Sequence, residues 1–82
     1  MKLSIKSIKQ LLYQSGVCNE NGRGAFKLSV DKIEEGYIIW WAFSNDPILK
    51  VLSGEGINAE IRPWAEFGGL GNSEVIFVKK VA

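Results

Sequence analysis

The chain of 82 residues contains no histidine, which is the commonest general base and the commonest metal ligand in proteins. Nucleophile pairs of the Ser-His or Cys-His type are therefore excluded. The single cysteine, Cys18, comes just after Gly16, where the first predicted helix ends, and the dipole at a helix C-terminus disfavours a thiolate. We predict that Cys18 is a small structural residue in the core or in a loop and that the chain has no catalytic residue.

The acidic residues offer little for catalysis or metal binding. Glu34 and Glu35 are adjacent, but they fall in a predicted hairpin turn, where successive side chains diverge into solvent. The segment Asn19-Glu20-Asn21 lacks the closing bidentate glutamate of a calcium loop. We therefore predict no metal, no cofactor and a protein that is not an enzyme.

The glycine-rich segment 67–72 invites comparison with phosphate-binding loops and with the GxxG loop of KH domains. A P-loop continues through Lys and Ser/Thr into a helix, whereas here Asn72-Ser73-Glu74 leads into a predicted strand. A KH loop joins two helices, and this segment joins two strands. We favour a flexible hairpin. The alternative is a loop whose exposed N–H groups cradle an anion or meet a partner's backbone.

Aromatic residues are the strongest functional signal. The run Tyr37 to Phe43, taken as a strand, places Tyr37, Ile39, Trp41 and Phe43 on one face and Ile38, Trp40 and Ala42 on the other. A domain of this size cannot easily cover both faces, so one aromatic face should lie near the surface. We predict that the larger set fills the core and that Trp40 points outward near Ile38. The alternative is that loops or a second copy of the chain cover Trp40.

The elements that position these aromatic residues follow from apolar periodicity and turn signals. A first helix begins at the N-cap Ser4 and stops at Gly16, and a second begins at the N-cap Asp46, with Pro47 in its first turn, and stops at Gly54. Strands are predicted at 25–31, 37–43, 57–64 and 75–79.

The arrangement of the strands follows from their burial patterns. The two strands that are apolar on both faces, 37–43 and 75–79, belong in the centre. The alternating strand 25–31 and the strand 57–64, which contains Pro63, belong at the edges. A right-handed crossover through the second helix then gives the strand order 3-4-2-1. We predict an α+β fold with the order αββαββ, a permuted ferredoxin-like sandwich with both helices on one face.

Composition indicates one domain over residues 1–82, because the chain is short and contains no linker-like segment. The net charge of +1 argues against a dedicated polyanion binder. A single cysteine cannot form an intramolecular disulfide, and no apolar run is long enough to span a bilayer. These features predict a cytoplasmic protein.

Lys2, Lys6 and Lys9 lie on one side of the first helix. We predict a solvated face, and the alternative is that these lysines contact an acidic partner.

The leading functional hypothesis is a small interaction protein that covers a surface on a larger protein. Its concrete form is an inhibitor, encoded by a phage or mobile element, that binds a host enzyme or complex. The predicted partner-binding residues are Trp40, Trp64, Arg62, Phe67, Gly69, Leu70 and Asn72. The alternative is a single-strand nucleic-acid binder in which aromatic rings on an open sheet stack bases, helped by Arg62, Lys27, Lys79 and Lys80. A homodimer sealed through the same face is compatible with either.

Overall fold

The computed structural model describes residues 3–19, 27–41, 43–69 and 71–79. In chain order, the elements are α1 (Ile5–Gln14), β1 (Ser29–Ile33), β2 (Gly36–Trp40), α2 (Asp46–Gly54), β3 (Ala59–Pro63), the short 3-10 helix η1 (Trp64–Phe67) and β4 (Glu74–Lys79). The predicted order αββαββ is therefore confirmed, with η1 added between the last two strands.

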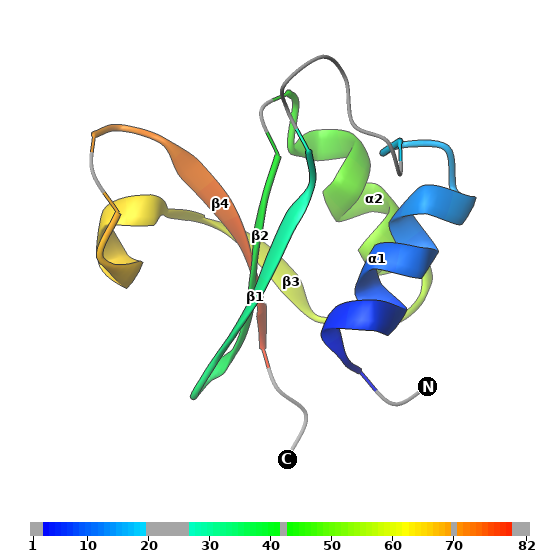
Figure 1. The fold of residues 1–82 in the computed structure, drawn as a ribbon, viewed down its shortest axis with the longest axis horizontal. Coiled ribbons are helices and arrows are strands. Elements are labelled where there is room, and N and C mark those ends of the chain that lie inside the picture. The colour runs from blue at the N-terminus through cyan, green and yellow to red at the C-terminus, as the bar shows by residue number, and fades with distance from the viewer. Residues whose placement is uncertain (1–2, 20–26, 42, 70, 80–82) are drawn as a thin grey trace.

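The four strands form one sheet in the order β1-β2-β4-β3, and each neighbouring pair is antiparallel. Because β2 and β3 both run antiparallel to β4, they are parallel to each other and separated by one strand, as the crossover through α2 requires. Figure 1 shows α1 and α2 packed on the same face of the sheet. The predicted α+β fold and strand order are confirmed.

Local capping signals set the ends of α1 as predicted. The Ser4 hydroxyl accepts a hydrogen bond from the Ser7 N–H, and the Ser7 hydroxyl accepts one from the Ser4 N–H, so that two N–H groups at the helix start are satisfied reciprocally. At the other end, Gly16 has a φ of 81°, a left-handed conformation that glycine adopts without steric penalty.

The start of α2 differs from the prediction by one residue. Asn45, not Asp46, is the N-cap, because the Asn45 carbonyl already accepts a hydrogen bond from the Leu49 N–H at 3.0 Å. Asp46 becomes the first helical residue, where its carboxylate still complements the helix dipole. The helix includes Gly54, and the left-handed residue beyond it is Gly56, with a φ of 74°.

The main core lies between the helices and one face of the sheet. From β2 and the residue after it, the core receives Tyr37, Ile39 and Trp41, which confirms the predicted choice of face. The helices contribute Ile8, Leu12, Ile48 and Leu52, each at most 1% exposed. The Tyr37 hydroxyl also donates to the Leu3 carbonyl at 3.1 Å, so the segment before α1 is fixed to the sheet.

The expectation that Phe43 fills the core is wrong. Phe43 is 39% exposed and touches Trp41 edge to face, with ring centroids 5.1 Å apart. The reason is that β2 ends at Trp40, so the two-residue alternation no longer applies to residue 43.

The other strand boundaries also shift. The first strand begins at Ser29 and extends to Ile33, because its ladder with β2 continues to a turn at residues 34–35. The prediction for residues 25–26 lies outside the described residues. The third strand covers Ala59–Pro63, and Trp64 belongs to η1 instead.

Among the described residues, no helix combines the length and hydrophobicity needed to cross a membrane.

Candidate functional site: an aromatic cleft on the open sheet face

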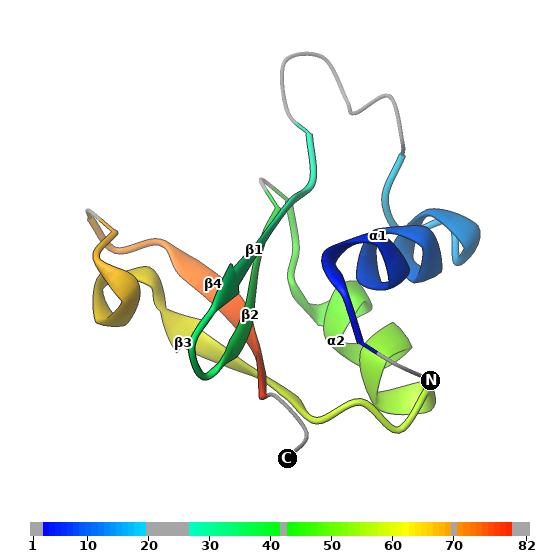
Figure 2. The same cartoon turned by 60° about the horizontal axis from the view of Figure 1, so that its bottom comes forward.

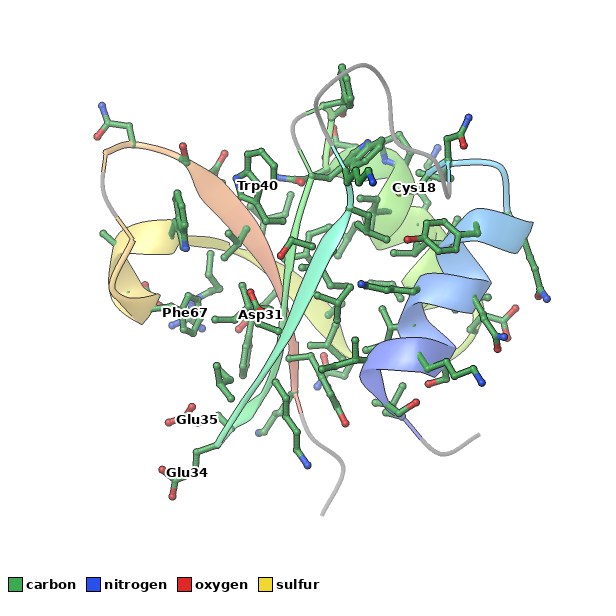
Figure 3. All side chains as sticks on the ribbon, viewed as in Figure 1. Cys18, Asp31, Glu34, Glu35, Trp40 and Phe67 are labelled. Atoms are coloured by element: carbon green, nitrogen blue, oxygen red, sulfur yellow. The ribbon has the colours of Figure 1, made fainter. Side chains whose placement is uncertain are left out.

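The second face of the sheet, which we call the open face, is turned away from both helices (Figure 1, Figure 2). The register places Asp31, Ile38, Phe77 and Glu60 in one row across the four strands. In the next row, Ser29 pairs with Trp40 and Arg62 pairs with Val75. Figure 3 shows Asp31, Trp40 and Phe67 on this side of the sheet and Cys18 on the helix side. Trp40 therefore points outward near Ile38, as predicted.

The open face is partly closed by η1, which lies on the side of the sheet opposite the helices (Figure 1, Figure 2). The Phe67 ring stacks on the Phe77 ring, with centroids 5.6 Å apart. Val75 is fully buried although it faces away from α1 and α2. The connection between β3 and β4 thus forms a second, smaller apolar cluster, and the open face is narrower than a bare sheet.

The glycine-rich connection has a defined packing role. Gly68 ends η1 in a left-handed conformation with a φ of 87°, and the Gly69 N–H donates to the Trp64 carbonyl at 3.1 Å. A Cβ atom added at Gly69 would collide with the Trp64 indole, so this ring lies directly against the backbone of residue 69. The connection is therefore a folded 3-10 turn, not the simple hairpin loop expected. Asn72 is exposed, and Leu70 lies outside the described residues.

A cleft of about 250 Å³ opens on this face between the sheet and η1. Its lining residues are Ser29, Asp31, Ile38, Trp40 and Trp64. Trp40 and Trp64 are each half-buried, whereas Asp31 is exposed. Two of the predicted partner-binding residues thus meet in one cleft, although they come from segments 24 positions apart. The lining therefore combines two tryptophans with one aspartate.

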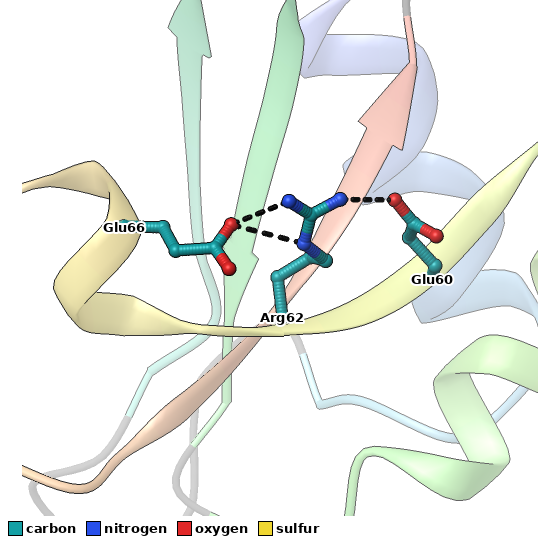
Figure 4. Close-up of polar contacts among 3 residues, drawn as sticks. All are labelled: Glu60, Arg62 and Glu66. Atoms are coloured by element: carbon teal, nitrogen blue, oxygen red, sulfur yellow. Dashed lines mark hydrogen bonds and ion pairs between the residues drawn. The ribbon is translucent and has the colours of Figure 1, made fainter.

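Arg62 stands beside this cleft but is already engaged by two carboxylates (Figure 4). Its guanidinium nitrogens lie 2.6 Å from Glu60 Oε1 and 2.6 Å from Glu66 Oε2. The two hydrogen bonds to Glu66, followed by the one to Glu60, raise the pKa of Arg62 above its ordinary value. The trio carries a net charge of −1, so Arg62 does not make this part of the face basic.

The remaining predicted residues lie elsewhere. Lys6 is exposed and Lys9 is half-buried on α1, and Lys2 lies outside the described residues. A depression of about 620 Å³ runs along this helix, but its lining residues all come from α1, so no second described element forms an opposing wall.

Cys18 is 3% exposed, and burial raises the pKa of its thiol to about 11. The described residues contain no group of three or more potential metal ligands.

Sequence analysis missed Ser29 and Asp31 as parts of the site. The sequence does contain a signal that could have identified them. The short turn at Glu34 and Glu35 sets the register of the first hairpin, and this register puts Asp31 opposite Ile38.

The comparisons with known proteins do not assign the chain to a family. Searches against protein-family models, curated proteins and solved structures found no match.

Proposed function

We propose that the protein is a small, non-enzymatic interaction module that binds another protein through the open face of its sheet. The observation that carries this proposal is the cleft in which Trp40 and Trp64 remain half-buried on the side away from the helices. Tryptophan is among the residues that contribute most binding energy when a partner buries them. The absence of histidine from the sequence removes the residue most often used for general acid–base catalysis.

The specific form of the proposal is an inhibitor that covers a surface on a larger host enzyme or complex. A two-layer domain whose aromatic cleft is already formed is suited to this role, because little conformational entropy is lost when preformed elements bind. The identity of the captured protein decides between this form and a more general adaptor.

The alternative of single-strand nucleic-acid binding finds less support in the contacts of this face. Arg62, the cation closest to the aromatic residues in the sheet register, is paired with two carboxylates, and Asp31 adds a further negative charge in the cleft. Phosphate groups would be repelled by these carboxylates. Titration with labelled single-stranded oligonucleotides at low salt tests this alternative, which requires binding that weakens steeply as salt is added.

The proposal is tested by affinity capture from cells that carry the gene. The bait proteins are the wild type, a Trp40→Ala/Trp64→Ala variant and a Lys50→Ala variant altered on the exposed side of α2. Circular dichroism first establishes that all three are folded. We expect a protein retained by the wild type and the lysine variant and lost by the tryptophan variant. Equal retention by all three baits would contradict the proposal.

A further inference from the structure

We propose that the cleft between Trp40 and Trp64 receives a cationic side chain, arginine or lysine, from the protein partner. This inference rests on the proposed function, because it names the chemistry of the partner residue that enters the same site.

The walls of the cleft suit a cation. Trp40 comes from β2 and Trp64 from η1, and Ile38 contributes an aliphatic surface between β1 and β4. The face of an indole attracts a cation more strongly than any other protein ring, and the stems of arginine and lysine pack well on apolar groups. The volume of about 250 Å³ is several times the roughly 30 Å³ that one water molecule occupies, so there is room for a long side chain.

Asp31 supplies the charge that distinguishes this cleft from a purely apolar one. Asp31 is one of the lining residues, and its Oδ2 is 3.5 Å from the Ser29 hydroxyl, which is a weak contact. The ion pairs found among the described residues both belong to Arg62, so Asp31 is left without a cationic partner there. A carboxylate with this freedom can accept hydrogen bonds from a guanidinium or an ammonium group.

The surroundings of the cleft have the same sign. Glu60 and Glu66 outnumber Arg62 beside it. Lys79 pairs with Gly36, one open-face row beyond Ile38, and Lys27 is an exposed residue two positions before Ser29. Neither lysine is among the residues that line the cleft. An anionic occupant would therefore meet repulsion, and a neutral apolar occupant would desolvate Asp31 without compensation.

The test uses two small probes that differ in charge but hardly in shape, Nα-acetylarginine amide and Nα-acetylcitrulline amide. The readout is the indole N–H signals of Trp40, Trp41 and Trp64 in nitrogen-15 NMR spectra, assigned with single Trp→Phe variants. We expect the arginine probe to shift the Trp40 and Trp64 signals with a Kd on the order of 10 mM. Trp41, which is 5% exposed on the helix side, serves as the internal control and should not respond.

Two charge variants make the assignment specific. Asp31→Asn should weaken binding of the arginine probe by about two- to fivefold and leave the citrulline probe unaffected. Glu55→Gln removes the same charge at an exposed position just after α2 and should change neither probe. Thermal unfolding of both variants establishes that they remain folded.

The outcomes separate this inference from the proposed function. Equal shifts with both probes, or equal probe affinity in the wild type and Asp31→Asn, would overturn the cationic assignment and leave the open face as an apolar docking surface. The absence of shifts at both Trp40 and Trp64 with the arginine probe would also overturn it. The capture experiment decides the proposed function independently, because it does not depend on either probe.

Discussion

The indole of Trp64 lies directly against the backbone of Gly69, at a position where a Cβ atom on residue 69 would overlap the ring. This contact holds one wall of the aromatic cleft. The glycine is needed here for space, because its φ is not positive, in contrast to Gly68 with its φ of 87°. The glycine-rich sequence therefore serves two purposes, a left-handed helix end at residue 68 and a close approach at residue 69.

Substitution of this glycine should displace the ring and damage the cleft. We expect Gly69→Ala to lower the free energy of unfolding by about 1–3 kcal/mol, the usual cost of overpacking, and to shift the Trp64 indole signal in NMR spectra. Urea unfolding measures the first effect.

The matched control is Gly54→Ala, since an added Cβ at that residue meets no atom within 4 Å and the site is the last turn of α2. This variant should be neutral or more stable by up to about 1 kcal/mol. An unchanged Trp64 signal in Gly69→Ala would show that the indole does not rest on this backbone.

Cys18 should be unreactive in the folded protein, because it is 3% exposed and its pKa is raised to about 11. A thiol reagent such as DTNB at pH 8 should therefore label the protein only after urea is added. Rapid labelling of the native protein would contradict the burial of this side chain.

The same shift predicts how stability depends on alkaline pH. The thiol of the unfolded chain loses its proton from about pH 9.0, whereas the folded protein holds it until about pH 11. The unfolded state thus binds fewer protons in this window, so the wild type should lose stability as pH rises from about 9 to about 11. Cys18→Ala removes this contribution. The free energy of unfolding of the wild type minus that of Cys18→Ala, measured at several pH values, should fall in this window and stay constant below it.

Much of the fold could be predicted from local signals in the sequence. Ser4 and Gly16 mark α1 because capping geometry depends on a few adjacent residues. The central positions of β2 and β4 follow from strands that are apolar on both faces, and Pro63 fits an edge because it cannot donate to the ladder. These signals are independent of contacts that form between distant segments.

Other features depend on contacts that no local pattern encodes. The end of β2 at Trp40 leaves Phe43 exposed, and apolar residues continue past this point, so the sequence contains no visible stop signal. The 3-10 helix η1 is four residues long, too short to show a helical period. The stacking of Phe67 on Phe77 and the packing of Trp64 on Gly69 follow from η1, and so they could not be anticipated.

Arg62 should matter more for the charge of the open face than for stability. Its side chain and both its partners are substantially exposed, and exposed ion pairs stabilise proteins weakly. We expect Arg62→Gln to change urea unfolding little and to tighten binding of the arginine probe, because Glu60 and Glu66 then carry uncompensated charge. Lys50→Gln, on the exposed side of α2, removes the same charge elsewhere and should leave probe binding unaltered. Weaker probe binding by Arg62→Gln would indicate that Arg62 supports the cleft by packing instead.

Substitution of the neighbouring tryptophans Trp40 and Trp41 should have different effects, because the two side chains lie on different faces of the sheet. Trp41 is 5% exposed within the main core, and Trp41→Ala should lower the free energy of unfolding by about 3–5 kcal/mol. Trp40 is half-buried at the cleft, and Trp40→Ala should cost under about 2 kcal/mol while abolishing the response of the Trp64 indole to the arginine probe. Urea unfolding and NMR titration measure the two effects. A larger loss of stability for Trp40→Ala than for Trp41→Ala would mean that the helices cover the opposite face of β2.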